Sequence, residues 1–472
     1  MMGLYRLRRT KHLVGKYKEL DKQEIYFAHP TELNDPMEGF RDIYWLGDRI
    51  VWQNLFRHYI YCLHITCVIS RITGDTGKVK PEHIPITSDV PENWTQEAVD
   101  LFDDICTRVF ERAKLLQFTL RIGNAKRKVR RDELLFYLYS FHHVALHEIE
   151  SAYFDHGLAS NRPLPLDHTS NFENSHKLQE VLGAIEEEDA HYEQVFKVSS
   201  FMTEQISLRY RMSPDSSRPD NITANRQFIV LDFPKKYMER LETIMYPNWY
   251  VACFLRSYSN SSTWGNYGDG HKGVCLIFKT DHEDERITVP LEQITGNSNQ
   301  GEEWRCRPME VHEVTYGEVH DEIDFFRSLG QLPESKSLDV WYKDATGSIS
   351  DCASHIVEDM EAWREGYWQS FYPGINKKTE HWKYEQESRL ILCSMLGELP
   401  DKRQRKLKYK FESLRGIIFG MRTSDRDKVR MLDVLKKKCR ENDRTEFQVF
   451  QAYYDHKTGN IGKYPVNIDL SE

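Results

Sequence analysis

Two acids and a guanidinium alternate in the last third of the chain, where Glu385, Glu387 and Arg389 precede the apolar residues 390–392. If this segment is a β-strand, the three side chains share one face, because successive side chains of a strand point to opposite faces. One carboxylate there can stabilise a developing positive charge, and Arg389 can orient that carboxylate. These residues are the first catalytic candidates; a solvated strand face with an ordinary ion pair is the alternative.

A second candidate is the polar and aromatic segment 253–273, which has four glycines within residues 265–273. Glycine lets a backbone approach a ligand closely, and the rings of Trp264 and Tyr267 can stack on a base or a nicotinamide. Ser257 and His271 flank them as further ligand-binding candidates. The alternative is an ordinary loop that caps a hairpin, since no phosphate-loop or dinucleotide fingerprint is matched.

A third cluster lies near the N-terminus, where Asn34 and Asp35 precede a proline and Glu38 follows it. Asn-Asp-Pro forms a turn by itself, so structure explains most of this pattern. Glu38 is the residue that the turn does not explain, and we expect this loop to lie near the site.

Histidines in the middle of the chain have the spacing of helical metal ligands, as in His143 and His147 or Glu188 and His191. Metal sites in helical bundles also need carboxylates from other helices, which are not evident here. We therefore assign no metal site and interpret these residues as structural or exposed.

Composition limits the class of protein. The chain has 472 residues and a net charge of −9, which suggests several domains or one interrupted domain and excludes a bulk nucleic-acid coat. Basic runs at 121–131 and 402–410 leave a phosphate-rich partner open. Nine scattered cysteines without a CxxC pair, and no apolar leader or membrane span, predict reduced thiols and a cytoplasmic location.

The elements that must position these residues fall into three zones. Residues 1–42 hold two short strands, 43–225 are mostly helical, and 226–472 return to mixed α/β. We expect an α+β fold: a mixed sheet assembled from the N- and C-terminal parts and interrupted by a large all-helical insertion. The patterns within these zones predict, among others, strands at 228–231 and 389–393, helices at 93–120 and 321–329, and one or two long helices over 175–211.

The motifs also follow a recognisable order: Leu4-Tyr5-Arg6, then Asn34-Asp35-Pro36-Met37-Glu38, then Trp264 with Tyr267 and Gly273, then Glu-x-Glu-x-Arg at 385–389. This order resembles the bacterial domain-of-unknown-function family twenty-nine seventy-one. The resemblance covers roughly residues 1–45 and 250–440, and it leaves the helical middle as an insertion. It implies a soluble bacterial protein, in some members linked to phage defence or a toxin-like role.

The motif order is also similar to that of ADP-ribosyltransferase-like domains. That similarity implies that Arg6 on the first strand holds a pyrophosphate or ribose, and that Glu387 stabilises the oxocarbenium-like state formed when NAD is cleaved. Tyr26, Tyr267 or Trp264 would stack on the nicotinamide, and Tyr5 is a further ligand-binding candidate. The sequence departs from that pattern at Ala28, where many relatives have serine, and it lacks a first-strand histidine.

Three functions follow as hypotheses. The first is an effector that uses NAD as an ADP-ribosyltransferase or NAD hydrolase on a protein or nucleic-acid target. The second is a nuclease or phosphodiesterase that holds Mg²⁺ with Asp35, Glu38, Glu385 and Glu387. The third is a non-catalytic sensor whose helical insertion contacts a partner or a second copy.

Overall fold

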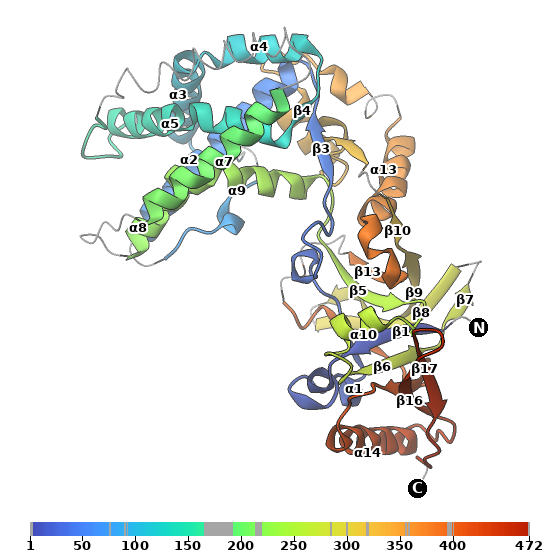
Figure 1. Cartoon of the computed structure of the whole chain (residues 1–472). Coiled ribbons are helices and arrows are strands. Elements are labelled where there is room, and N and C mark those ends of the chain that lie inside the picture. Colours follow the sequence, from blue (N-terminus) through green and yellow to red (C-terminus); the bar gives the residue numbers. More distant parts are fainter. Residues whose placement is uncertain are drawn as a thin grey trace. The chain divides into compact units, whose positions relative to one another are not determined.

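The computed structural model divides into two compact units (Figure 1). Unit 1 consists of Met1–Phe40, Pro247–Asp321 and Ser370–Glu472, and unit 2 consists of Arg41–Tyr246 and Glu322–Gln369. The structure describes residues 3–74, 77–88, 91, 93–164, 192–212, 220–283, 286–298, 301–317, 321–354, 356, 359–393, 399 and 401–470. Unit 2 therefore reaches beyond the predicted insertion 43–225, to residue 246 and across a second segment.

A large mixed sheet forms the centre of unit 1. Its described strands are β1 (Leu4–Arg8), β2 (Glu24–Tyr26), β5 (Trp249–Leu255), β6 (Val274–Phe278), β7 (Asp281–Glu283), β8 (Arg286–Ser298), β9 (Gly301–Glu313), β13 (Glu387–Cys393), β14 (Lys406–Tyr409), β15 (Leu414–Phe419), β16 (Gln448–Asp455) and β17 (Asn460–Pro465). Their order is β17-β16-β15-β6-β1-β5-β13-β9-β8-β14-β2, with β7 paired to β8.

The N-terminal strand β1 lies inside this sheet, hydrogen-bonded to β6 on one side and β5 on the other. β6 reads Val-Cys-Leu-Ile-Phe and is buried along its whole length, as expected for a strand covered on both faces. The predicted fold class is confirmed: one α+β sheet is built from the two ends of the chain, and a largely helical region separates them.

One edge of β5 has two neighbours. Leu255, near its end, faces Tyr5 of β1, whereas Val251 forms a bridge with Ala28, just after β2, through two 2.8 Å backbone hydrogen bonds. β1 and the residue after β2 therefore contact the same edge of β5 at different points along its length, and β1 and β2 are not paired with each other.

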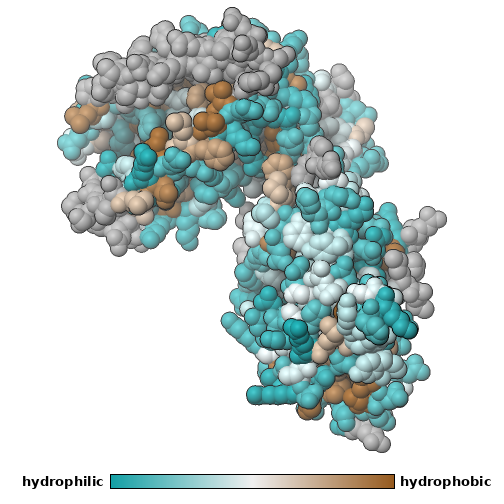
Figure 2. Space-filling model, viewed as in Figure 1, coloured by the Kyte–Doolittle hydropathy of each residue, from teal (hydrophilic) through white to brown (hydrophobic). Residues whose placement is uncertain are grey.

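Apolar layers cover both faces of this sheet. On one face, α14 (Asp425–Glu441) packs Met431 and Leu435 into a large core. On the other face, Trp264 of α10 (Ser261–Tyr267) is the centre of a smaller core. In the view of Figure 2, hydrophilic residues cover most of the visible surface of unit 1.

Unit 2 is helical, with a small sheet at its start. Its described α-helices of eight residues or more are α2 (Arg49–Thr73), α3 (Gln96–Arg112), α4 (Leu115–Ala125), α5 (Arg131–Asp155), α7 (Tyr192–Met212), α8 (Asp220–Gln227) and α9 (Phe233–Leu241), and α13 (Met360–Ile375) begins in it. Strand β3 (Asp42–Trp45) pairs with β4 (Val129–Arg130) and β11 (Glu322–Asp324). No described helix has an apolar stretch that would span a membrane.

Three predicted elements were wrong in type or extent. The predicted helix 93–120 is two helices, α3 and α4, because Lys114 between them has a left-handed φ of 51°. The predicted strand 228–231 is helical and continues α8 into α9, and the predicted helix 321–329 is β11 followed by a short 3-10 turn. Of the predicted helix 175–211, residues 175–191 lie outside the described residues.

Candidate functional site

A cavity of about 490 Å³ lies in unit 1, where β1 and β2 separate beside β5. This volume is typical of a small-molecule site. The cavity is lined by side chains from β1, β2 and β5, from α10, and from the segments before β13 and β14. Among them are Arg6, Arg8, Arg9, His12, Tyr17, Glu19, Glu24, Tyr26, Glu32, Asn34, Cys253, Asn266, Tyr267, Lys378, Glu385, Glu387, Lys402 and Lys406.

Lys378 is the centre of a buried charge cluster at the wall of this cavity. Its Nζ lies 2.6 Å from Glu387 Oε2, 3.1 Å from Glu385 Oε2 and 3.5 Å from Glu38 Oε2. The Lys378 side chain is 5% exposed, and the three carboxylate side chains are 1–2% exposed. One ammonium group therefore holds three carboxylates that would otherwise repel one another.

Arg389 is the second cation of the cluster. Its Nε donates to Glu387 Oε1 over 2.9 Å, its Nη2 lies 2.6 Å from Glu38 Oε1, and its Nη1 donates to the carbonyl of Ile375 over 2.8 Å. The guanidinium is completely buried. Three carboxylates and two cations thus share a site removed from water, which costs desolvation energy unless each charge is paired.

The shared cations divide the carboxyl groups into two kinds. Burial alone would raise the pKa of Glu387, but Arg389 and Lys378 outweigh it and lower that pKa to about 2. For Glu385 and Glu38 burial dominates, and it raises the pKa of both above the usual value. The site therefore combines a carboxylate that stays ionised with a neighbouring carboxyl that binds a proton more readily, the usual basis of acid and base assignments.

Two tyrosine hydroxyls contact this segment, one at the Glu385 carboxyl group and one at the Glu387 backbone. Tyr267 donates to Glu385 Oε1 over 2.6 Å, and Tyr316 accepts from the backbone N–H of Glu387 over 2.8 Å. Glu385 ends a 3-10 helix, Gln386 has a left-handed φ of 48°, and β13 begins only at Glu387. The expectation that all three residues share one strand face was therefore wrong for Glu385: a turn, and not strand alternation, brings it to Glu387.

Arg6 lies on the other side of the sheet. It pairs in register with Leu276 of β6 and its guanidinium covers the ring of Phe254, whereas Glu387 is in register with Leu255 on the opposite face. The cavity touches both residues because it passes through the gap between β1 and β2.

The Arg6 guanidinium is only partly satisfied. Its Nη2 donates to the carbonyl of Tyr26 over 3.1 Å, but its buried Nη1 has no hydrogen-bond partner within the described part of the chain. Burial, and then Arg8, lower its pKa to about 10, so it is still a cation at neutral pH. A buried donor without a partner is costly, and an anionic ligand in the cavity would satisfy it.

Most of the residues singled out by sequence meet at this place. Arg6, Tyr26, Asn34, Tyr267, Glu385 and Glu387 line the cavity, and Glu38 and Arg389 belong to the cluster behind it. Two residues of the predicted basic run 402–410 also line it: Lys402, which precedes β14, and Lys406, which begins that strand.

Five other candidates do not line the cavity. Tyr5 packs against Tyr258, Ser257 bonds to Ser259, and His271 stacks on Trp264. Asp35 Oδ1 accepts from the N–H of Met37 and so stabilises its own turn.

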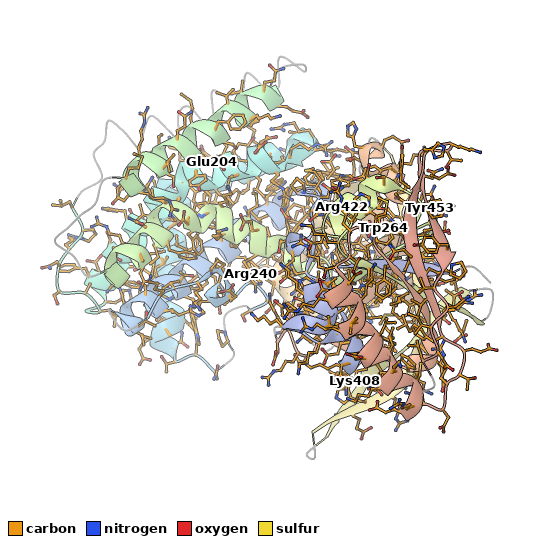
Figure 3. The ribbon with its side chains drawn as sticks, turned by 60° about the horizontal axis from the view of Figure 1, so that its bottom comes forward. Glu204, Arg240, Trp264, Lys408, Arg422 and Tyr453 are labelled. Carbon is orange, nitrogen blue, oxygen red and sulfur yellow. The ribbon has the colours of Figure 1, made fainter. Side chains whose placement is uncertain are left out.

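Trp264 has no exposed surface, and its indole N–H donates to the carbonyl of Tyr258 over 2.7 Å. Figure 3 shows it among the densely packed side chains of unit 1. Two of the nearby glycines are required by chain packing: a Cβ on Gly268 would lie 2.7 Å from the Trp264 carbonyl, and one on Gly273 2.5 Å from that of Arg8. Their role here is close contact between backbone segments, and not contact with a ligand.

Sequence reasoning missed Lys378, the residue that contacts all three carboxylates. It lies in the two-residue strand β12 (Lys377–Lys378), shortly before the Glu-x-Glu-x-Arg motif but not part of it, and a pair of lysines has no distinctive pattern. His12, Tyr17 and Cys253 were also missed as cavity residues.

The described residues include no group of three or more His, Cys, Asp or Glu side chains arranged to hold a metal ion. Glu38, Glu385 and Glu387 do converge, but Lys378 Nζ lies among their oxygens. Asp35, the fourth residue of the Mg²⁺ hypothesis, is engaged in its turn.

Residues 263–390 match the model of the family described as "Protein of unknown function (DUF2971)". The match confirms the family resemblance of this part of the chain, which includes Tyr267, Lys378, Glu385, Glu387 and Arg389. No curated protein and no solved structure matches the chain.

Proposed function

We propose that unit 1 binds NAD in the cavity between β1 and β2 and cleaves its nicotinamide–ribose bond, transferring ADP-ribose to water or to a target. One observation carries this proposal: a single cavity joins a buried guanidinium that lacks a partner for Nη1 to a pair of carboxyl groups with opposite pKa shifts. An anionic phosphate suits the first, and a developing glycosyl cation suits the second.

The chemistry needs little from the protein beyond charge and position. When the bond between C1′ of the ribose and the nicotinamide nitrogen breaks, nicotinamide leaves with the electron pair and C1′ becomes electron-poor. The O–H or N–H of the acceptor then bonds to C1′, and its proton passes to a base. An ionised carboxylate near C1′ lowers the energy of the cationic state, as in glycoside hydrolysis.

The chain's residues divide this work in a defined way. Glu387, held ionised by Arg389 and Lys378, supplies the negative charge. Glu385, whose pKa is raised mainly by burial, exchanges the proton with the acceptor, and Tyr267 orients its carboxyl group. Arg6 binds a phosphate oxygen through Nη1, and Tyr26 offers an aromatic ring to the nicotinamide.

The direct test is nicotinamide release from NAD, followed by chromatography, for the full chain and for Glu387→Gln and Glu385→Gln. We expect each variant to lose at least about 100-fold in turnover, because each removes a charge or proton carrier from the reacting centre. Arg6→Lys keeps a charge but loses the planar guanidinium, and it should mainly raise KM. Glu412→Gln, at an exposed residue of a 3-10 turn outside the cavity, is the control.

Two results would reject the proposal. One is a folded wild-type protein that neither binds NAD nor releases nicotinamide in the presence of cell-extract proteins and nucleic acids as acceptors. The other is turnover that is the same in Glu387→Gln, Glu385→Gln and the wild type.

A role as a bacterial effector in defence or toxicity extends this proposal, with the helices of unit 2 selecting the target. The metal-dependent nuclease remains a prediction that no particular contact in the structure favours. A non-catalytic sensor would share the cavity, and it would be distinguished by NAD binding without nicotinamide release.

A further inference from the structure

Beyond the carboxylates and Arg6, the cavity is also lined by the segment that follows β1 and by β2, and we call this part its second end. Arg9, His12, Tyr17 and Glu19 line it from that segment, and Glu24 lines it from β2. These residues lie outside the matched family region and have no role in the bond cleavage proposed above.

Two aromatic rings form a corner at this end. The rings of His12 and Tyr17 are 5.2 Å apart at an angle of 80°, and Tyr17 is 42% exposed although it is an aromatic side chain beside a cavity. A planar base placed in such a corner contacts one ring by its face and the other by its edge.

The polar atoms at this end are also incompletely used. Within the described residues the buried Nδ1 of His12 has no hydrogen-bond partner, as is true of Arg6 Nη1 in the same cavity. Burial lowers the pKa of His12, so its ring is neutral at pH 7 and offers one donor and one acceptor. The carboxylate of Glu24 adds an acceptor, which matches the exocyclic amine of an aminopurine.

We infer that this end, formed by His12, Tyr17 and Glu24, is a subsite for the adenine base, so that unit 1 selects a dinucleotide over nicotinamide mononucleotide. The inference rests on the proposed function for the identity of the substrate. The order along the cavity is then base at Tyr17, phosphates at Arg6 and nicotinamide ribose at Glu387.

The test compares the full chain with Tyr17→Ala, Tyr17→Phe and Tyr454→Ala. Tyr454 is an exposed tyrosine of β16 (55%, against 42% for Tyr17) that does not line the cavity, so it controls for loss of a surface ring. Binding of NAD, ADP and nicotinamide mononucleotide is measured by calorimetry, and KM and kcat are measured where turnover occurs.

In Tyr17→Ala we expect NAD and ADP affinity to fall about tenfold, the order of one lost stacking contact, with KM raised and kcat within about twofold. Affinity for nicotinamide mononucleotide, which has no adenine, should not change. Tyr17→Phe should retain most of the wild-type affinity, and Tyr454→Ala all of it.

The inference and the proposed function fail in different ways. If NAD is cleaved but Tyr17→Ala leaves NAD affinity unchanged, or weakens NAD and the mononucleotide equally, the base subsite is rejected and the proposed function stands. If ADP binds and depends on Tyr17 while no nicotinamide is released, the subsite stands and the proposed function falls. If none of the three ligands binds the folded wild type, both are rejected.

Discussion

Buried histidines of unit 2 and buried charges of unit 1 are held in different ways. In unit 2, His142 lies between the Tyr59 hydroxyl and the carbonyl of Ile229, both at 2.8 Å, and burial lowers its pKa to about 3. His58 and His64 likewise contact tyrosine hydroxyls, and burial lowers the pKa of each to about 4. These groups are neutral at physiological pH, so their burial needs only hydrogen bonds.

Unit 1 instead buries three carboxylates and two cations around one cavity. Apolar residues of similar volume often stabilise a fold as well as a buried ion pair, so stability alone does not explain such a cluster. Strongly shifted pKa values beside a cavity are typical of functional sites. The histidines of unit 2 are therefore accounted for by the fold alone, whereas the charges of unit 1 are those expected of the proposed site.

The largest expected effect comes from removing a cation of the cluster. Arg389→Met should lower the free energy of unfolding by about 3–5 kcal/mol, because Glu38 and Glu387 lose a buried partner. Urea denaturation, monitored by a probe in each unit, measures this loss. The double variant Arg389→Met/Glu387→Gln should recover part of it. A loss below about 1 kcal/mol in the single variant would contradict the comparison.

Lowering the pH should reduce the stability of unit 1, because Glu387 becomes protonated. Its folded pKa of about 2 lies below the ordinary value of 4.5, so its contribution is complete above pH 4.5 and is lost as the pH falls towards 2. This loss should be roughly 3 kcal/mol, and Glu387→Gln should not show it.

The contribution of Glu385 to stability depends on pH in the opposite direction, because its pKa is raised in the folded protein. This contribution is complete below the ordinary pKa and is lost as the pH rises through the folded pKa. Denaturation from pH 2 to 8 separates the two slopes. A Glu387→Gln profile parallel to that of the wild type below pH 4.5 would show that Glu387 is not held ionised.

A substitution in unit 2 should affect stability alone. His142→Phe leaves the Tyr59 hydroxyl and the Ile229 carbonyl without their partner, and it should cost about 1–3 kcal/mol. NAD affinity and turnover should be those of the wild type. If this variant changes KM while the protein stays folded, the separation between a structural unit 2 and a functional unit 1 is wrong.

The smallest effect is expected at the rim of the cavity, where Lys402 and Glu32 form an ion pair of 2.9 Å. The lysine side chain is 67% exposed, so Lys402→Ala should change the free energy of unfolding by less than about 1 kcal/mol. A loss as large as that of Arg389→Met would show that exposure does not separate the two kinds of ion pair.

Part of the site could be predicted because short motifs contain it. Arg6, Tyr26, Asn34, Tyr267, Glu385 and Glu387 were identified from local patterns, and all of them line the cavity. The failures have a common physical cause: burial decides whether an aromatic or a glycine meets a ligand or the core. Trp264 and Tyr267 lie three residues apart on α10, yet the first is in the core and the second bonds to Glu385.

The sequence by itself determined the α+β class, the family resemblance and the strands that both ends of the chain contribute to one sheet. β6 is apolar on both faces, so its central position follows from its composition. Only the tertiary structure decided that β1 and β2 separate and that Lys378 lies among three carboxylates. It also decided that the pKa of Glu385 is raised whereas that of Glu387 is lowered. The reason is that local propensity and alternation act over a few residues, whereas desolvation and charge pairing depend on how the folded chain surrounds each group, including the distant Glu38.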